Sequence, residues 1–128
     1  MQKITVNEII LAPPIGETID IISIISKCTS ALSKLFTLDS DIDILFHDDN
    51  RVGIWCEGIN DNADVWQEKD FQGDDDCCYG ETEVDWLENA GFIDEYNIKT
   101  ALQEEFPGWD IDCNDVICQT PDEVYEEA

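Results

Sequence analysis

The chain carries a net charge of −25 on 128 residues, and this charge is unevenly distributed. Residues 1–36 are balanced, with three acidic and three basic side chains. Residues 37–99 hold nineteen acidic residues against three basic ones, and residues 100–128 hold nine acidic residues and no base. Because such an excess of one sign repels itself, it destabilises a compact state. We therefore expect a compensating benefit, and the charge favours a strongly basic partner.

The composition nevertheless predicts a folded protein. Hydrophobic residues make up 43% of the chain, including seventeen isoleucines and twelve aromatic residues, whereas acidic disordered segments are poor in both kinds. At this length we expect one domain over residues 1–128. No apolar run reaches the roughly 18 residues of a membrane span, and the N-terminus does not resemble a signal peptide. We therefore expect a cytoplasmic protein (in the host cell, if a phage encodes it) whose six cysteines are reduced.

Hydrophobic periodicity predicts an α+β fold. Residues 3–11 are rich in β-branched side chains and predict a strand, and residues 17–36 have helical spacing with isoleucines on several faces, which predicts a central, well-buried helix. Residues 41–46 and 52–56 alternate around a four-residue turn, which predicts a β-hairpin that directs Ile42, Ile44 and Phe46 to one face. The expected architecture is a small antiparallel sheet, built from hairpins and packed on the Ile-rich helix.

The second half of the chain gives shorter signals. Turn and capping residues predict a strand near 63–71, a helix over 82–90, a helix over 94–106, a hairpin of 109–113 with 116–120, and a short or frayed helix over 121–128.

Acidic side chains at alternate strand positions are the main candidate for a binding surface. Side chains two residues apart in a strand share one face, at about 6.6 Å spacing. Asp39, Asp41 and Asp43 are therefore expected to form an outward row, and Asp110 and Asp112 a second one. Regularly spaced carboxylates resemble the phosphates that attract DNA-binding proteins. The alternative is a solvated acidic face with no target.

Further acidic residues and two aromatic residues extend the predicted partner-binding set. Most aromatic residues are expected in the core, but Trp66 and Tyr79 lie in the least regular region and are the candidates for exposed anchors that stack on arginines. The additional acidic members are Asp48, Asp49, Asp74, Asp75, Asp76, Glu81, Glu83, Asp85 and Asp115.

Metal binding and catalysis have little support, and we expect no metal, no cofactor and no enzymatic activity. Asp110, Asp112 and Asn114 resemble the start of an EF-hand loop, but Pro121 stands where the closing glutamate belongs. The cysteine spacings do not match zinc sites. The single histidine, His47, belongs to no nucleophile signature and falls in a predicted turn.

These observations favour a DNA mimic, that is, an inhibitor that occupies the nucleic-acid site of a basic nuclease or defence effector without binding nucleic acid itself. In size and charge alone, the chain resembles the acidic proteins that phages and mobile elements use against restriction or CRISPR systems. An alternative is an immunity protein that neutralises a basic nuclease toxin through a compact hot spot. A third is adaptation to high salt, which the balanced residues 1–36 do not favour. The sequence leaves the oligomeric state open.

Overall fold

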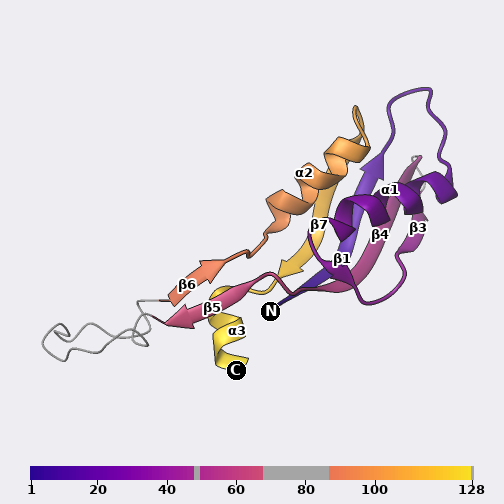
Figure 1. The fold of residues 1–128 in the computed structure, drawn as a ribbon. Helices are drawn as coiled ribbons and strands as arrows, with labels where there is room; N and C mark the ends of the chain where they lie inside the picture. The colour runs from indigo at the N-terminus through magenta and orange to yellow at the C-terminus, as the bar shows by residue number, and fades with distance from the viewer. Residues whose placement is uncertain (48–49, 68–86, 128) are drawn as a thin grey trace, which may run out of the picture.

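A five-stranded antiparallel sheet with two helices on one face forms the body of the structure (Figure 1). The computed structural model describes residues 1–47, 50–67 and 87–127, and the side chains within these ranges except those of 65–67, 87–89 and 125–127. The α+β class predicted from the sequence is confirmed. In chain order, the described elements are β1 (Gln2–Ala12), α1 (Ile21–Ser33), β2 (Thr37–Leu38), β3 (Asp43–His47), β4 (Arg51–Asn60), β5 (Asp64–Gln67), β6 (Leu87–Ala90), α2 (Glu95–Glu105), β7 (Asp110–Cys118) and α3 (Pro121–Glu127).

The sheet is held together mainly by contacts between distant parts of the chain. Its strands follow the order β2-β4-β1-β7, and β3 pairs with β4 beside β2. The predicted hairpin is confirmed as β3 and β4, with His47 opposite Arg51. The other pairings of the main sheet join segments far apart in sequence, so local hairpins account for only one part of it. Strands β5 and β6 form a separate two-stranded sheet.

A bulge in β1 changes the phase of its apolar alternation. Ile4 and Val6 are buried, and the next buried residues are Ile9 and Leu11. The register with β4 shifts by one residue between Val6 and Ile9, which keeps both pairs on the same side of the sheet. The bulge contains Glu8, whose side chain takes part in the contacts described below.

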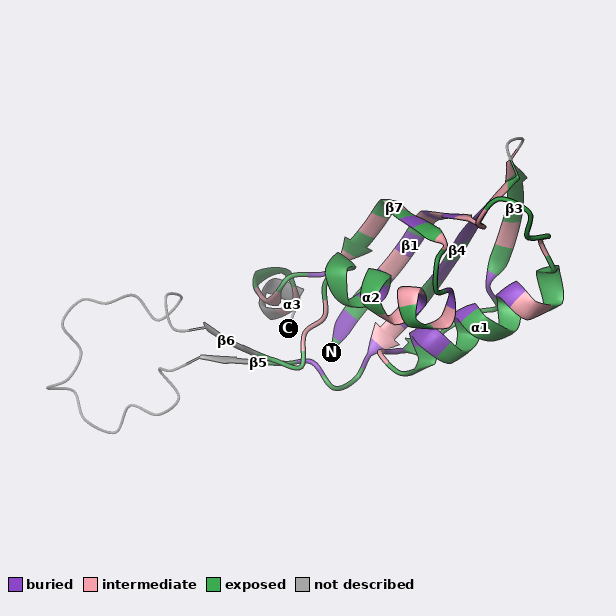
Figure 2. Cartoon of the chain, turned by 90° about the horizontal axis from the view of Figure 1, so that it is seen from above, coloured by how far each residue is buried: buried purple, intermediate pink, exposed green. Residues whose placement is uncertain are grey.

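The hydrophobic core lies between the sheet and the helices α1 and α2, which lie on the same face (Figure 2). Each helix contributes one buried stripe to this core, while the opposite stripes remain exposed, as expected for amphipathic helices. The fully buried side chains include Ile24, Cys28 and Leu32 of α1, Ile98 and Leu102 of α2 with the adjacent Phe106, and Val52 and Ile54 of β4.

Helix α1 is less central than its composition predicts. It begins at Ile21 rather than at residue 17, because the Asp20 carboxylate accepts a hydrogen bond from the Ile22 backbone N–H at 3.1 Å and so caps the first turn. The expectation of a well-buried helix with isoleucines packed on several faces is wrong. Ile21, Ile22 and Ile25 are all exposed.

Two local predictions in the second half of the chain are also wrong. The predicted hairpin of 109–113 with 116–120 is a single strand, β7, which pairs along its length with β1. The register of the β1–β7 ladder shifts on both sides of the Glu8–Asp115 pair. The turn-forming residues therefore lie in an irregular part of the strand, and the chain does not reverse direction there. Residues 87–90, predicted as the end of a helix, form β6, while residues 82–86 lie outside the described residues.

The remaining predicted elements agree more closely. Asp94 caps α2, and Pro107 and Gly108 follow its end, as expected. The strand predicted near 63–71 is present at Asp64–Gln67, with 68–71 outside the described residues. The C-terminal segment forms the short helix α3. None of the described helices has the length and hydrophobicity needed to span a lipid bilayer.

Candidate protein-binding surface

One face of the five-stranded sheet is not covered by any described helix, and we call it the open face (Figure 2). Cross-strand partners lie on the same side of a sheet, so the strand registers define its membership. Because Val52, Ile54 and Cys56 face the helices, the alternate positions of β4 and their partners face outward. The open face comprises Lys3, Thr5, Ile10 and Ala12 of β1, Asp43, Leu45 and His47 of β3, Arg51, Gly53, Trp55, Glu57 and Ile59 of β4, and Asp110, Asp112 and Ile117 of β7.

A chain of polar side chains crosses the open face from one edge to the other. His47 of β3 reaches over β4, so that its Nε2 lies 3.3 Å from Glu8 Oε2 of β1. This contact becomes an ion pair when the imidazole is protonated. The other carboxylate oxygen of Glu8 accepts a hydrogen bond of 2.7 Å from Asn114 Nδ2 of β7. The open face is therefore fixed by side-chain contacts as well as by the backbone ladder.

Trp55 is an exposed aromatic residue flanked by carboxylates on this face. It is 44% exposed, lies directly opposite Asp43 of β3, and is two residues from Glu57 on its own strand. Leu45, which is 49% exposed, lies diagonally across from it. A rigid aromatic ring beside acidic groups is suited to stacking on an arginine while the carboxylates bind its guanidinium.

The aspartates that face outward lie at opposite edges of the sheet. Asp43 is on the edge strand β3, whereas Asp110 and Asp112 are on the edge strand β7, and all three are exposed. Strands β4 and β1 lie between these edges, so the two acidic edges are about 14 Å apart at the usual strand spacing. The outward aspartates of β3 and β7 therefore do not form one continuous acidic surface.

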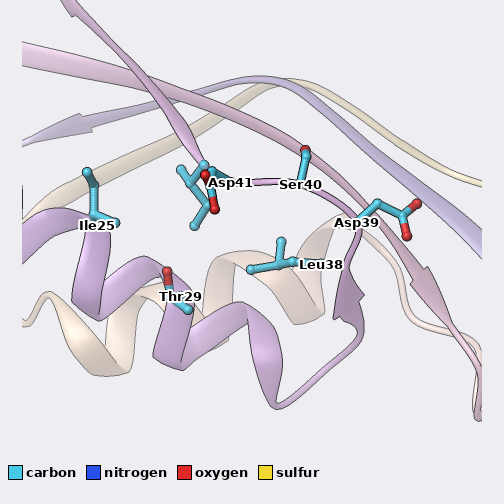
Figure 3. Close-up of a pocket in the computed structure, with 7 residues that line it drawn as sticks. Ile25, Thr29, Leu38, Asp39, Ser40 and Asp41 are labelled. Atoms are coloured by element: carbon cyan, nitrogen blue, oxygen red, sulfur yellow. The ribbon is translucent and has the colours of Figure 1, made fainter.

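The predicted row of Asp39, Asp41 and Asp43 is not a strand row. Strand β2 ends at Leu38 and β3 begins at Asp43, so only Asp43 belongs to the open face by register. Asp39 and Asp41 instead line a groove of about 600 Å³ between α1 and the segment 38–42 (Figure 3). Both residues are exposed.

Most of the other predicted partner-binding residues lie outside the described part of the structure. Asp115 is described and exposed, and it pairs with Glu8 in the irregular part of the β1–β7 ladder. Trp66 lies in β5, where its backbone pairs with Glu88 and its side chain is not described. The remaining members, all outside the described residues, are Asp48, Asp49, Asp74, Asp75, Asp76, Tyr79, Glu81, Glu83 and Asp85.

Trp55 was not among the aromatic residues predicted to be exposed, although the signal for its exposure is present in the sequence. The alternation that places Val52, Ile54 and Cys56 in the core places Trp55 on the opposite face of the same strand. The cross-strand chain of His47, Glu8 and Asn114 had no comparable signal, because it depends on the strand order and on the bulge.

The described cysteines are unsuited to nucleophilic chemistry. Cys28, Cys56, Cys113 and Cys118 are free thiols, and burial is the main cause that raises the pKa of each. Cys28 reaches a pKa of about 12, and the other three reach a pKa of about 11. Thiols of this kind are almost fully protonated at neutral pH. Among the described residues, no group of three or more His, Cys, Asp or Glu side chains is arranged to hold a metal ion.

No family model, curated protein or solved structure matches this chain. What the protein binds must therefore be inferred from its own charge and surface.

Proposed function

We propose that the protein is an acidic inhibitor that binds a basic, nucleic-acid-binding protein and blocks its nucleic-acid site. The observation that carries this proposal is the pair of acidic edges on one open face, with Asp43 on one side and Asp110 and Asp112 on the other. Measured across the strands, the two edges are about 14 Å apart, which is close to the width of the major groove of B-DNA, about 12 Å. Along the strands, Asp112 is displaced from Asp43 by two residues. A protein groove that binds two phosphate strands can therefore meet both edges together.

The arrangement of the β7 edge supports the same proposal. Asp110 and Asp112 are two residues apart in β7, which corresponds to about 6.6 Å. Backbone pairing and the contacts of Glu8 fix the strands, so the backbone positions that carry these carboxylates are set before binding.

The proposed partner is a nuclease or a defence effector in the cytoplasm. The net charge of −25 attracts a cationic surface at long range and repels nucleic acid, so the partner is a protein rather than DNA. The open face also contains Lys3 and Arg51, so its charge is patterned rather than uniformly negative. Such patterning favours one orientation of the bound partner.

A competition experiment tests the proposal. Immobilised protein captures a partner from a lysate, the partner is purified, and its binding to a labelled DNA duplex is measured with increasing amounts of the inhibitor. We expect competitive displacement of the duplex, with an affinity for the inhibitor that falls steeply as salt is raised. A captured partner that binds the duplex and the inhibitor at the same time contradicts the proposal.

Matched variants locate the interface. The triple variant Asp43→Asn, Asp110→Asn, Asp112→Asn removes three charges from the open face. The control variant Asp61→Asn, Glu104→Gln, Asp122→Asn removes three charges from exposed positions elsewhere. We expect the first variant to weaken binding at least about tenfold more than the control, since the acidic edges contact the partner directly. Equal losses of affinity in the two variants would show that binding depends on the net charge and not on the position of the aspartates.

An immunity protein that neutralises a nuclease toxin is a second candidate, and the exposure of Trp55 favours it. A compact hot spot centred on an aromatic residue loses most of its binding energy through one substitution. If Trp55→Ala alone abolishes binding while the triple aspartate variant retains most of it, the immunity mode is supported over mimicry. The opposite result supports the DNA mimic.

A further inference from the structure

The groove between α1 and the segment 38–42 combines aliphatic walls with acidic groups, and we call it the α1 groove (Figure 3). Its volume of about 600 Å³ lies within the range of about 300–1,000 Å³ that is usual for ligand sites in proteins. Ile25 and Thr29, which are one helical turn apart, form the wall on α1. The other wall contains Leu38, Asp39, Ser40, Asp41 and Ile42.

The second wall is a stretch of chain that is longer than the strand ladder requires. Strand β2 pairs with β4 up to Leu38 opposite Gly58, and β3 pairs with β4 from Asp43 opposite Trp55. Four residues, 39–42, therefore lie where β4 has only two, and the extra chain forms the wall opposite α1. Because both ends of this segment are tied to β4, the groove is shaped before a ligand binds.

The carboxylates of the α1 groove are not neutralised by any described side chain. Asp39 and Asp41 are exposed, and none of the described residues that line the groove is basic. The ion pairs within the described part of the chain involve other carboxylates. The groove therefore offers negative charge beside an aliphatic surface. A ligand that matches both features carries a positive charge on a hydrocarbon stem.

We infer that the α1 groove binds an arginine side chain of the proposed basic partner. A guanidinium is more weakly hydrated than an ammonium group, so entering a half-apolar groove costs arginine less than lysine. Its planar fork presents five N–H donors, which the two carboxylates and the hydroxyls of Thr29 and Ser40 can accept. The aliphatic part of the arginine then lies along Ile25 and Leu38.

The position of the α1 groove fits a partner that also contacts the open face. Asp41 is two residues before Asp43, which begins β3 and is the acidic residue of that edge. The groove lies on the α1 side of this edge, whereas Asp43 lies on the open face. A partner that contacts the β3 edge can therefore place one arginine around it. The inference rests on the proposed function for the nature of this partner, but its test does not use the partner.

Two-dimensional amide NMR of the full chain tests the inference with a pair of small probes. Acetyl-leucyl-arginine amide carries the guanidinium, and acetyl-leucyl-citrulline amide has nearly the same shape without the charge. At an ionic strength of about 0.15 M, which screens long-range attraction, the arginine probe should shift the amide signals of residues 25–29 and 38–42 saturably, with a millimolar Kd. The citrulline probe should bind at least about tenfold more weakly. Absence of saturable shifts at these residues, or equal binding of the two probes, overturns the inference.

Variants separate the groove from general attraction to an acidic protein. The double variant Asp39→Asn, Asp41→Asn should weaken binding of the arginine probe at least about tenfold. The control Asp61→Asn, Asp122→Asn removes the same charge at exposed positions elsewhere and should change the affinity by less than about twofold. Thr29→Phe fills the groove from an exposed helix position without changing the charge, and should also abolish binding. Equal losses in the two double variants, or wild-type binding by folded Thr29→Phe, would place the arginine outside the groove.

The outcome of this test is separable from that of the proposed function. The probes contain no partner protein, so their failure to bind does not bear on the displacement of DNA by the inhibitor. Conversely, a captured partner that binds DNA and the inhibitor together contradicts the proposed function but leaves the binding of the arginine probe unchanged.

Discussion

The imidazole of His47 occupies the space above Gly53, where its Nε2 reaches within 3.3 Å of Glu8 Oε2. Three adjacent strands meet in this contact, since His47, Gly53 and Glu8 belong to β3, β4 and β1. A side chain on Gly53 would close the space, because a Cβ atom there would lie 2.9 Å from His47 Nε2 and 3.5 Å from Glu8 Oε2. The glycine is thus what allows β3 and β1 to interact across β4.

Two glycines of β4 should therefore differ in their tolerance of alanine. Gly53→Ala should destabilise the protein by about 1–2 kcal/mol, because the His47 ring can move aside at the cost of its contact with Glu8. Gly58→Ala should cost about 3 kcal/mol or more, because its Cβ would overlap the buried Phe36 ring and approach the Thr37 carbonyl oxygen at 2.6 Å. Urea unfolding of both variants measures the difference. Equal losses would contradict this account of the space above Gly53.

The N-terminus of α2 provides a second prediction. Asp94 Oδ1 accepts a hydrogen bond of 3.0 Å from the Asn97 backbone N–H, while Asn97 Oδ1 accepts one of 2.8 Å from the Asp94 N–H. Asp94→Ala should destabilise the protein by about 1 kcal/mol through loss of this cap. Asp94→Asn removes the same charge but keeps the acceptor, so it should be nearly neutral. If thermal melts show that the two variants are equally destabilised, the charge rather than the cap is responsible.

The cap of α2 was predictable because its residues are neighbours in sequence, and the same holds for the β3–β4 hairpin. Strand β7 was not predictable from the local sequence, because Asn114 and Asp115 are residue types that favour turns. Pairing of β7 with β1, about a hundred residues away in sequence, overrides that local preference. Residues 87–90 show the same conflict, since the helix-like signal gives way to pairing with β5.

The candidate binding surface was partly predictable for a similar reason. Alternation correctly places Asp43, Asp110 and Asp112 outward, since that requires only the period of a strand. Their separation to opposite edges depends on the strand order, which no local pattern encodes. The interruption of the strand at Asp39 and Asp41 depends on how the chain passes from β2 to β3 beside α1.

A buried polar cluster connects the sheet to the segment before α2. Gln2 is 1% exposed, and its Nε2 donates hydrogen bonds of 2.8 Å to the backbone carbonyls of Ile93 and Gln119. Its Oε1 accepts hydrogen bonds from Asn60 Nδ2 at 3.0 Å and from the Ile93 N–H at 3.1 Å. The side chain of Gln2 thus uses both of its donors and both of its acceptor positions.

Replacing Gln2 with Met should destabilise the protein by about 2–3 kcal/mol. The thioether is similar in size but leaves several buried partners without a hydrogen bond. Gln119→Met is a useful comparison, because the Gln119 side chain accepts a hydrogen bond at Oε1 from the Lys3 N–H at 3.0 Å. Loss of this bond should cost about 1 kcal/mol. Urea unfolding measures both values. A Gln2→Met variant as stable as wild type would show that water readily replaces this cluster.

The buried thiols predict how stability changes at alkaline pH. Burial, followed by the nearby Cys56 thiol, raises the pKa of Cys28 from 9.0 to about 12. In the unfolded chain, this thiol loses its proton near pH 9, whereas in the folded protein it keeps it. Between pH 9 and the folded-state pKa of about 12, the unfolded state binds fewer protons than the folded state. The free energy of unfolding therefore falls as pH rises, by at most about 1.4 kcal/mol per pH unit for this one group. Below pH 9 the contribution of Cys28 to the free energy of unfolding does not change with pH.

Urea unfolding of wild type and Cys28→Ala from pH 8 to pH 10.5 isolates this effect. The alanine variant should be less stable at neutral pH because it leaves a small cavity in the core. The difference between the two proteins should then shrink above pH 9, since only the wild type loses stability through Cys28. Lysine titration and overall repulsion affect both proteins equally and cancel in the comparison. A constant difference across this range would mean that Cys28 ionises in the folded protein as readily as in the unfolded chain, and that its burial does not hold the proton.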